Sequence, residues 1–148
     1  MKFLLLLFFI GFFAYGNDVT FDTASADQSR KMNTTLNITI GTYTFKATLL
    51  ENETTKAFKA MLPLTLSMSE LNGNEKYFHM ETSLPTHPSN VGTIHTGDVM
   101  LWGSNSFVLF YETFSTSYTY TRLGHIEDTT NLAKALGKGD VVVTIGLE

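Results

Sequence analysis

Residues 97–112, GDVMLWGSNSFVLFYE, hold two apolar runs on either side of a short polar turn. The first run is VMLW at residues 99–102, and the second is SFVLFYE at residues 106–112. Valine and the aromatic residues in these runs favour strands, and the Gly-Ser-Asn sequence at residues 103–105 is typical of a turn. The segment therefore predicts a β-hairpin whose large side chains fill a core.

Strand patterns continue on both sides of this hairpin. In residues 42–50 the large residues Tyr43, Phe45 and Leu49 alternate with polar ones, which is typical of a strand buried on one face. Similar patterns predict five further strands, at residues 36–40, 64–69, 76–80, 117–126 and 141–147. With the two strands of the hairpin, the predicted total is eight.

Two short helices are predicted among the strands. Residues 52–62 begin with Asn52 as an N-terminal cap and end at Pro63, and residues 129–137 end with Gly137 as a C-terminal cap. Closure leaves short strands without unpaired edges, so we predict a mainly β fold, a closed eight-stranded β-barrel capped by two short helices. The large residues of the hairpin would then fill the barrel or pack under its helices.

The N-terminal segment has the pattern of a secretory signal peptide. In MKFLLLLFFIGFFAYG, Lys2 precedes an apolar run of about a dozen residues, and small residues follow where signal peptidase cuts. An uncleaved membrane anchor is the alternative, but the run is shorter than the roughly 20 apolar residues that cross a bilayer. We expect a signal peptide at residues 1–16, a polar flexible leader at 17–35 and one domain at 36–148. The protein would be exported, periplasmic or secreted, with no membrane span after cleavage.

Composition and motifs exclude several classes of function. The sequence contains no cysteine, which excludes disulfides, thiolate metal sites and cysteine nucleophiles. Without residues 1–16 the net charge is −5, which disfavours nucleic acid as a partner. The four histidines do not occur at metal-ligand spacings, and there is no Gly-x-Ser-x-Gly motif. We expect no metal ion and no cofactor, and we expect a monomer.

Several segments together resemble the bacterial cyclophilin-like domain family. They are EKYFHMETSLP at residues 75–85, the hairpin at 97–112, YTRLG at 120–124, and the strand and helix patterns near both ends of the domain. The most specific part is Gly-Asp followed by an apolar strand, a Gly-Ser-Asn turn and Phe-Tyr-Glu. The resemblance covers residues 36–148, and it implies a closed eight-stranded barrel capped by two helices.

The catalytic motifs of true cyclophilins are missing from this chain. Those enzymes carry a Phe-His-Arg segment, whose arginine assists proline isomerisation, and a Gln-Gly-Gly-Asp segment that lines the same groove. This chain has Phe78, His79 and Met80, and it has no glycine-rich acidic segment. The resemblance therefore implies the fold without the isomerase motifs.

Polar and aromatic residues on three predicted strands indicate a ligand-binding groove. Glu75, Tyr77 and His79 share one face of a strand, because alternate residues point the same way. Tyr120 and Arg122 share a face of another strand, where a guanidinium beside tyrosine rings can present a planar pair of donors. The indole at the end of the first hairpin strand can form a wall. The candidate ligand-binding residues are Arg122, Trp102, Tyr77, His79, Glu75 and Tyr120.

These observations predict an exported, non-catalytic binding domain for a peptide or a small-molecule ligand. The alternative is a weak peptidyl-prolyl cis-trans isomerase, in which Arg122 replaces the missing arginine of the cyclophilin motif. A structural or assembly role is the third interpretation.

Overall fold

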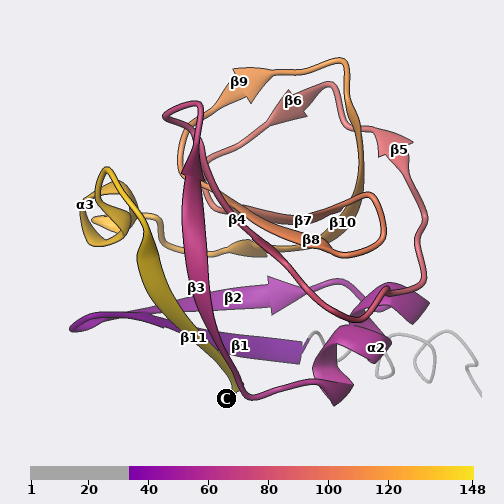
Figure 1. Ribbon diagram of the computed structural model, residues 1–148, viewed down its shortest axis with the longest axis horizontal. Coiled ribbons are helices and arrows are strands. Elements are labelled where there is room, and N and C mark those ends of the chain that lie inside the picture. Colours follow the sequence, from indigo (N-terminus) through magenta and orange to yellow (C-terminus); the bar gives the residue numbers. More distant parts are fainter. Residues whose placement is uncertain (1–33) are drawn as a thin grey trace, which may run out of the picture. The chain divides into compact units, whose positions relative to one another are not determined.

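The hairpin forms where the sequence predicts it. In the computed structural model, which describes residues 34–148 (Figure 1), β7 (Asp98–Trp102) pairs with β8 (Ser106–Phe110) around a tight turn. Gly103 in this turn has a φ of +59°, a conformation that favours glycine. Asn105 ties the turn to the chain after the neighbouring strand, because its Nδ2 donates to the Met80 carbonyl at 3.0 Å. The predicted signal peptide and most of the predicted leader lie outside the described residues.

Eight antiparallel strands close into a barrel, which confirms the predicted mainly β fold. The remaining barrel strands are β1 (Thr34–Ile40), β2 (Tyr43–Leu49), β3 (Leu64–Leu71), β4 (Glu75–His79), β10 (Thr119–Ile126) and β11 (Val141–Leu147). Their order around the barrel is β2-β1-β11-β3-β4-β8-β7-β10, and β10 pairs with β2 to complete the closure. Thus β1 begins two residues before the predicted start of the domain.

Three very short strands lie where the sequence predicts only connecting segments. β5 (Ser89–Asn90) pairs with β10, while β6 (Thr93–Ile94) and β9 (Phe114–Ser115) pair with each other. A two-residue strand is too short to produce a recognisable alternation, so these pairings depend on tertiary contacts. Figure 1 shows β6 and β9 outside the barrel, next to β7 and β8.

The helix α2 (Glu53–Ala60) forms as predicted, between β2 and β3. The Asn52 side chain accepts a hydrogen bond from the Thr55 backbone N–H at 2.8 Å, and the Thr55 hydroxyl oxygen accepts one from the Asn52 N–H at 3.1 Å. This reciprocal capping satisfies backbone donors at the start of the helix. Phe58 is fully buried and stacks on Phe107, with 5.2 Å between ring centroids. No helix among residues 34–148 is long and apolar enough to span a bilayer.

The second helix, α3 (Leu132–Leu136), is shorter than predicted and ends at Gly137, the predicted cap. A buried lysine connects this region to β4. The Nζ atom of Lys76 donates to the carbonyls of Gly137 and Gly139 at 2.9 and 2.6 Å, and it lies 3.5 Å from a carboxylate oxygen of Glu70. A buried ammonium requires such oxygen partners, so Lys76 joins β3, β4 and the chain after α3.

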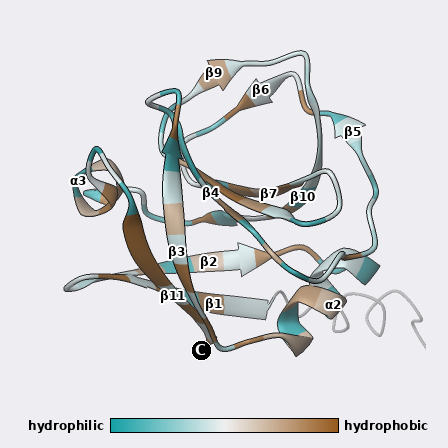
Figure 2. Cartoon of the chain, in the orientation of Figure 1, coloured by the Kyte–Doolittle hydropathy of each residue, from teal (hydrophilic) through white to brown (hydrophobic). Residues whose placement is uncertain are grey.

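Two hydrophobic clusters lie on opposite faces of the hairpin. Phe107 and Leu109 belong to the main core inside the barrel, which also receives the apolar faces of α2 and α3. A second cluster lies on the outer face, and it consists of Ile94, Met100, Val108, Phe110 and Tyr120. The outward residues of the hairpin therefore pack under the segments that carry β6 and β9, whereas the sequence predicts that the large hairpin residues fill the barrel or pack under its helices. Figure 2 shows hydrophobic residues along barrel strands such as β11.

Candidate ligand-binding site

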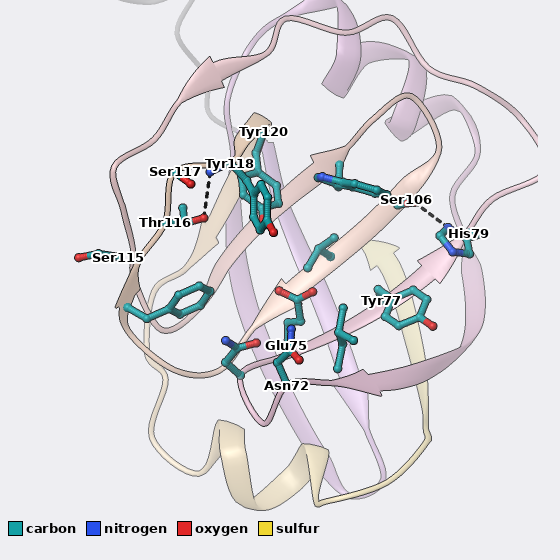
Figure 3. A pocket seen from close by; sticks show the side chains of 15 residues that line it. Asn72, Glu75, Tyr77, His79, Ser106, Ser115, Thr116, Ser117, Tyr118 and Tyr120 are labelled. Carbon is teal, nitrogen blue, oxygen red and sulfur yellow. Dashed lines mark hydrogen bonds between the residues drawn. The ribbon is translucent and has the colours of Figure 1, made fainter.

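A pocket of about 620 Å³ opens on the outer face of the barrel, beside the second hydrophobic cluster. It is lined by β4 and β8, by the turn between β3 and β4, and by residues 114–118, which connect β8 to β10. Figure 3 shows the 15 side chains that line it. A volume of this size is typical of sites that bind small molecules.

Three candidate residues reach the pocket from β4. Glu75, Tyr77 and His79 share one face of β4, as the alternation predicts, and the structure shows that this is the outer face. They pair in register with Phe110, Val108 and Ser106 of β8. The rings of Tyr77 and His79 lie side by side, with their centroids 5.1 Å apart. The alternation of β4 thus accounts for one side of the pocket.

His79 also forms a hydrogen-bonded pair with a serine. Its Nδ1 atom lies 2.6 Å from the hydroxyl oxygen of Ser106, which is buried at the start of β8. Serine nucleophiles work with a histidine that a third polar group orients, most often a carboxylate. Among residues 34–148, no carboxylate is hydrogen-bonded to His79. The pair therefore joins β4 to β8 at the edge of the pocket and lacks the arrangement of a catalytic triad.

Glu75 is the buried acid of the pocket. Only 9% of its surface is exposed, and it has no hydrogen-bond or ion-pair partner among the described residues. Burial, with a smaller contribution from the nearby charge of Glu70, raises the pKa of the Glu75 carboxyl group to about 7. The carboxyl group can therefore hold or release a proton near neutral pH.

Aromatic side chains complete the pocket. Tyr120 is buried, and its ring meets Phe110 edge to face at 5.6 Å. Burial, then the charge of Glu75, raises the pKa of the Tyr120 hydroxyl group. Trp102 and Tyr118 are 52% and 67% exposed, so they form the rim that a ligand would meet first.

Arg122 does not line this pocket, although it shares the outer face of β10 with Tyr120. Its guanidinium instead points toward the segment between β5 and β6, where it lies 3.5 Å from the carbonyl oxygen of Val91. It is not stacked on a tyrosine, because the cation–π pair found in the described part of the chain joins Lys76 and Tyr111. The structure therefore brings together five of the six candidate residues and separates Arg122 from them.

Several residues of the pocket were missed by sequence reasoning. They are the two amides of the β3–β4 turn and the first four residues of the segment that begins with β9, namely Asn72, Asn74, Phe114, Ser115, Thr116 and Ser117. The turn residues resemble any other turn, and the polar segment resembles a surface loop. Only the unusual sequence FSTSY, with an aromatic residue on each side of three hydroxyl residues, could have drawn attention to this segment.

The Gly-Asp pair at the start of β7 has a structural role. Asp98 is buried, accepts a hydrogen bond from the His95 backbone N–H at 2.8 Å, and lies 2.9 Å from Nδ1 of His125 on β10. Gly97 has a φ of +94°, and a Cβ atom there would lie 2.6 Å from the Thr129 side chain. These contacts fix the start of the hairpin against β10. In residues 34–148 there is no group of three or more metal-ligating side chains.

Comparison with known proteins agrees with this architecture. A family model described as a cyclophilin-like family matches residues 38–146, from β1 to β11. The solution structure of a hypothetical protein from Archaeoglobus fulgidus is similar in fold, with a TM-score of 0.57 and 20% sequence identity. The similarity covers 78% of this chain and 95% of that protein. No curated protein is significantly similar in sequence. Because the family match includes every strand of the barrel, the chain belongs to the cyclophilin-like family.

Proposed function

We propose that the protein is an exported, non-catalytic binding domain, and that it holds a small ligand or a short peptide segment in the pocket on β4 and β8. The observation that carries this proposal is the pocket itself, about 620 Å³ in volume and lined by five aromatic rings and several hydroxyl and amide groups. Aromatic walls with a few convergent polar groups are characteristic of ligand sites.

The exposed aromatic residues at the rim support a binding role. Trp102 and Tyr118 expose more than half of their surfaces, which has no benefit for folding. Rings in such positions lose exposed apolar area when a ligand covers them, and their few rotatable bonds keep the entropy loss small. The pocket would thus gain binding energy from rings that are already positioned.

The prolyl isomerase alternative is less well supported by the geometry. It required Arg122 to act in the same groove as the aromatic residues, and Arg122 lies outside the pocket beside Val91. Met80, which follows His79 where true cyclophilins have arginine, is buried and belongs to the main core. We therefore favour binding over isomerisation.

Trp102 allows a direct test, because it is the one tryptophan of the chain and stands at the rim. A library of small soluble fragments and proline-containing tetrapeptides would be titrated into residues 17–148 while tryptophan fluorescence and backbone amide shifts are recorded. We expect ligands that change the fluorescence and shift residues 75–79 and 114–118. The Tyr118→Ala variant should weaken their binding at least about tenfold.

Val142→Ala is the matched control, because Val142 is 57% exposed and does not line the pocket. This variant should bind the same ligands as the wild type does. Amide shifts scattered over the whole surface, or equal affinity of the Tyr118→Ala and wild-type proteins, would contradict the proposed site. Exchange between cis and trans proline peptides in the same samples would revive the isomerase alternative.

A further inference from the structure

The charged residues of the pocket favour a cationic ligand. Among its lining residues Glu75 is the only carboxylic acid, and none is a lysine or an arginine. We infer that the pocket selects ligands that carry an organic ammonium group, whose N–H donors and positive charge meet the Glu75 carboxylate. This inference rests on the proposed binding function and names the chemistry that the same pocket would recognise.

The surroundings of Glu75 differ from those of the other acids near the barrel. Glu70 accepts a hydrogen bond from the Tyr111 hydroxyl and lies 3.5 Å from Lys76, and Asp98 is paired with His125. Glu75 has no such partner among the described residues, although 91% of its surface is buried. A buried carboxylate without a partner is destabilising, so a bound cation would supply what the fold does not.

The hydrogen-bonding capacity of an ammonium group fits the pocket through Glu75 alone. Asn74 also lines the pocket, and its side-chain oxygen is buried without a hydrogen-bond partner among the described residues. A carboxylate and an amide oxygen accept hydrogen bonds, and an ammonium group has up to three donors and no acceptor. The buried Asn74 oxygen is out of reach of a ligand in the pocket, so Glu75 is the acceptor that a protonated amine would meet, whereas an anionic ligand would face a negative charge.

Aromatic rings surround the carboxylate. Figure 3 shows the Glu75 carboxyl group pointing toward the middle of the pocket, with Tyr118 and Tyr120 on one side and Tyr77 on the other. The negative face of an aromatic ring attracts a cation, and more strongly where water is excluded. The rings would thus add to the attraction by Glu75 and would contact the apolar part of the ligand.

The ionisation of Glu75 makes the proposed binding dependent on pH. The titratable and charged groups near it are Glu70 on β3, Lys76, Tyr77 and His79 on β4, Tyr111 after β8, and Tyr118 and Tyr120 beside β10. With its pKa near 7, Glu75 is mostly protonated at pH 5.5 and mostly ionised at pH 8. An ammonium ligand should therefore bind more tightly at pH 8, and below pH 7 its binding should release a proton from the Glu75 carboxyl group.

The test uses three probes of similar shape and different charge, namely benzylammonium, benzyl alcohol and benzoate. Each would be titrated into residues 17–148 at pH 5.5 and pH 8, with Trp102 fluorescence and the amide shifts of residues 75–79 as the readout. We expect benzylammonium to bind at least about tenfold more tightly than benzyl alcohol at pH 8, and benzoate not to bind. The affinity of benzylammonium should fall about tenfold at pH 5.5, because Glu75 is then protonated while benzylammonium keeps its charge.

Glu75→Gln should remove the preference for benzylammonium, while Glu112→Gln should change it less than about twofold. Glu112 is exposed and close to the 114–118 segment but does not line the pocket, so it controls for general negative charge. A lysine derivative blocked at its backbone amine and carboxylate, compared with the same compound acetylated on Nζ, identifies the source of the ammonium group. If the lysine compound binds more tightly than benzylammonium, the natural ligand is a lysine side chain of a protein. If benzylammonium binds more tightly, the natural ligand is a free amine.

The outcomes separate this inference from the proposed function. Equal binding of benzylammonium and benzyl alcohol in the pocket, or an unchanged preference in Glu75→Gln, would overturn the ammonium inference and leave the binding function standing. Failure of every probe and every library fragment to shift the pocket would overturn both. Loss of the pH dependence in Glu75→Gln would assign it to Glu75, whereas an unchanged pH dependence in this variant would assign it to another group such as His79 and would overturn the inference.

Discussion

At the level of single residues, Glu75 connects the pocket to the stability of the fold. In the unfolded chain its carboxyl group has an ordinary pKa near 4.5, and in the folded protein the pKa is about 7. Below pH 4.5 the group is protonated in both states, so it does not oppose folding. As the pH rises toward 7 the unfolded state loses its proton first, and the folded state becomes relatively less stable. Well above pH 7 the carboxyl group is ionised in both states, so the decrease in folding stability no longer changes with pH.

We therefore predict that Glu75→Gln stabilises the protein at pH 8 and has little effect at pH 4. Two and a half pKa units correspond to about 3 kcal/mol, and partial access of water reduces this to about 2 kcal/mol. Urea unfolding of both proteins between pH 4 and pH 8 would measure the difference. A difference in the free energy of unfolding that does not change with pH would show that Glu75 has an ordinary pKa.

Asp98 holds the start of the hairpin in place through its hydrogen bonds. It is buried at the start of β7 and is held by the His95 backbone and the His125 side chain. Its neighbour Gly97 needs a positive φ and has no room for a side chain. The Gly-Asp pair thus shapes the start of β7. The residues that line the pocket, in contrast, do not form a recognisable sequence motif.

At the level of elements, the seam between β10 and β2 is the contact that makes the sheet a barrel. Gly124 pairs with Leu49 there, next to an irregularity in the register of β10 between Arg122 and Gly124. A Cβ atom on Gly124 would lie 2.3 Å from the carbonyl oxygen of Thr48 and 3.1 Å from the Leu49 Cα. Both atoms belong to the backbone, so no side-chain movement can relieve the clash.

Gly124→Ala should therefore destabilise the protein by about 2–3 kcal/mol, because the two strands must separate to admit one methyl group. Gly146→Ala is the control, since a Cβ atom on Gly146 in β11 would meet nothing within 4 Å. Thermal and chemical denaturation of both variants would compare their stabilities. Equal stabilities would mean that the seam can widen without loss of its hydrogen bonds.

Strand alternation explains which elements could be predicted. The eight barrel strands each span five or more residues, which is enough for the period of two to appear in the sequence. The exceptions are β5, β6 and β9, with two residues each. β5 forms by pairing with β10, and Ile94 of β6 and Phe114 of β9 pack over the outer face of the hairpin. The wall of the pocket that the sequence did not predict consists of β9 and the residues that follow it, 114–117.

At the level of the whole molecule, export remains a prediction from residues 1–16. We propose that signal peptidase cuts after Gly16, so that the mature chain begins at Asn17. Expression of the full sequence in a bacterial host, followed by fractionation and mass measurement of the intact protein, would test this. Protein retained in the membrane fraction at its full mass would favour the uncleaved anchor instead.

The sequence by itself determined the class of fold, the eight strands, both helix caps and which candidate side chains share a face of their strand. These features depend on neighbours a few residues apart, so the pattern of polar and apolar residues records them. Only the tertiary structure decided that β4 and β8 adjoin residues 114–118 to form a pocket, that Arg122 lies outside it, and that Glu75 is buried without a partner. Burial and proximity depend on segments that are distant in the chain, and the local pattern does not encode which segments will cover a given face.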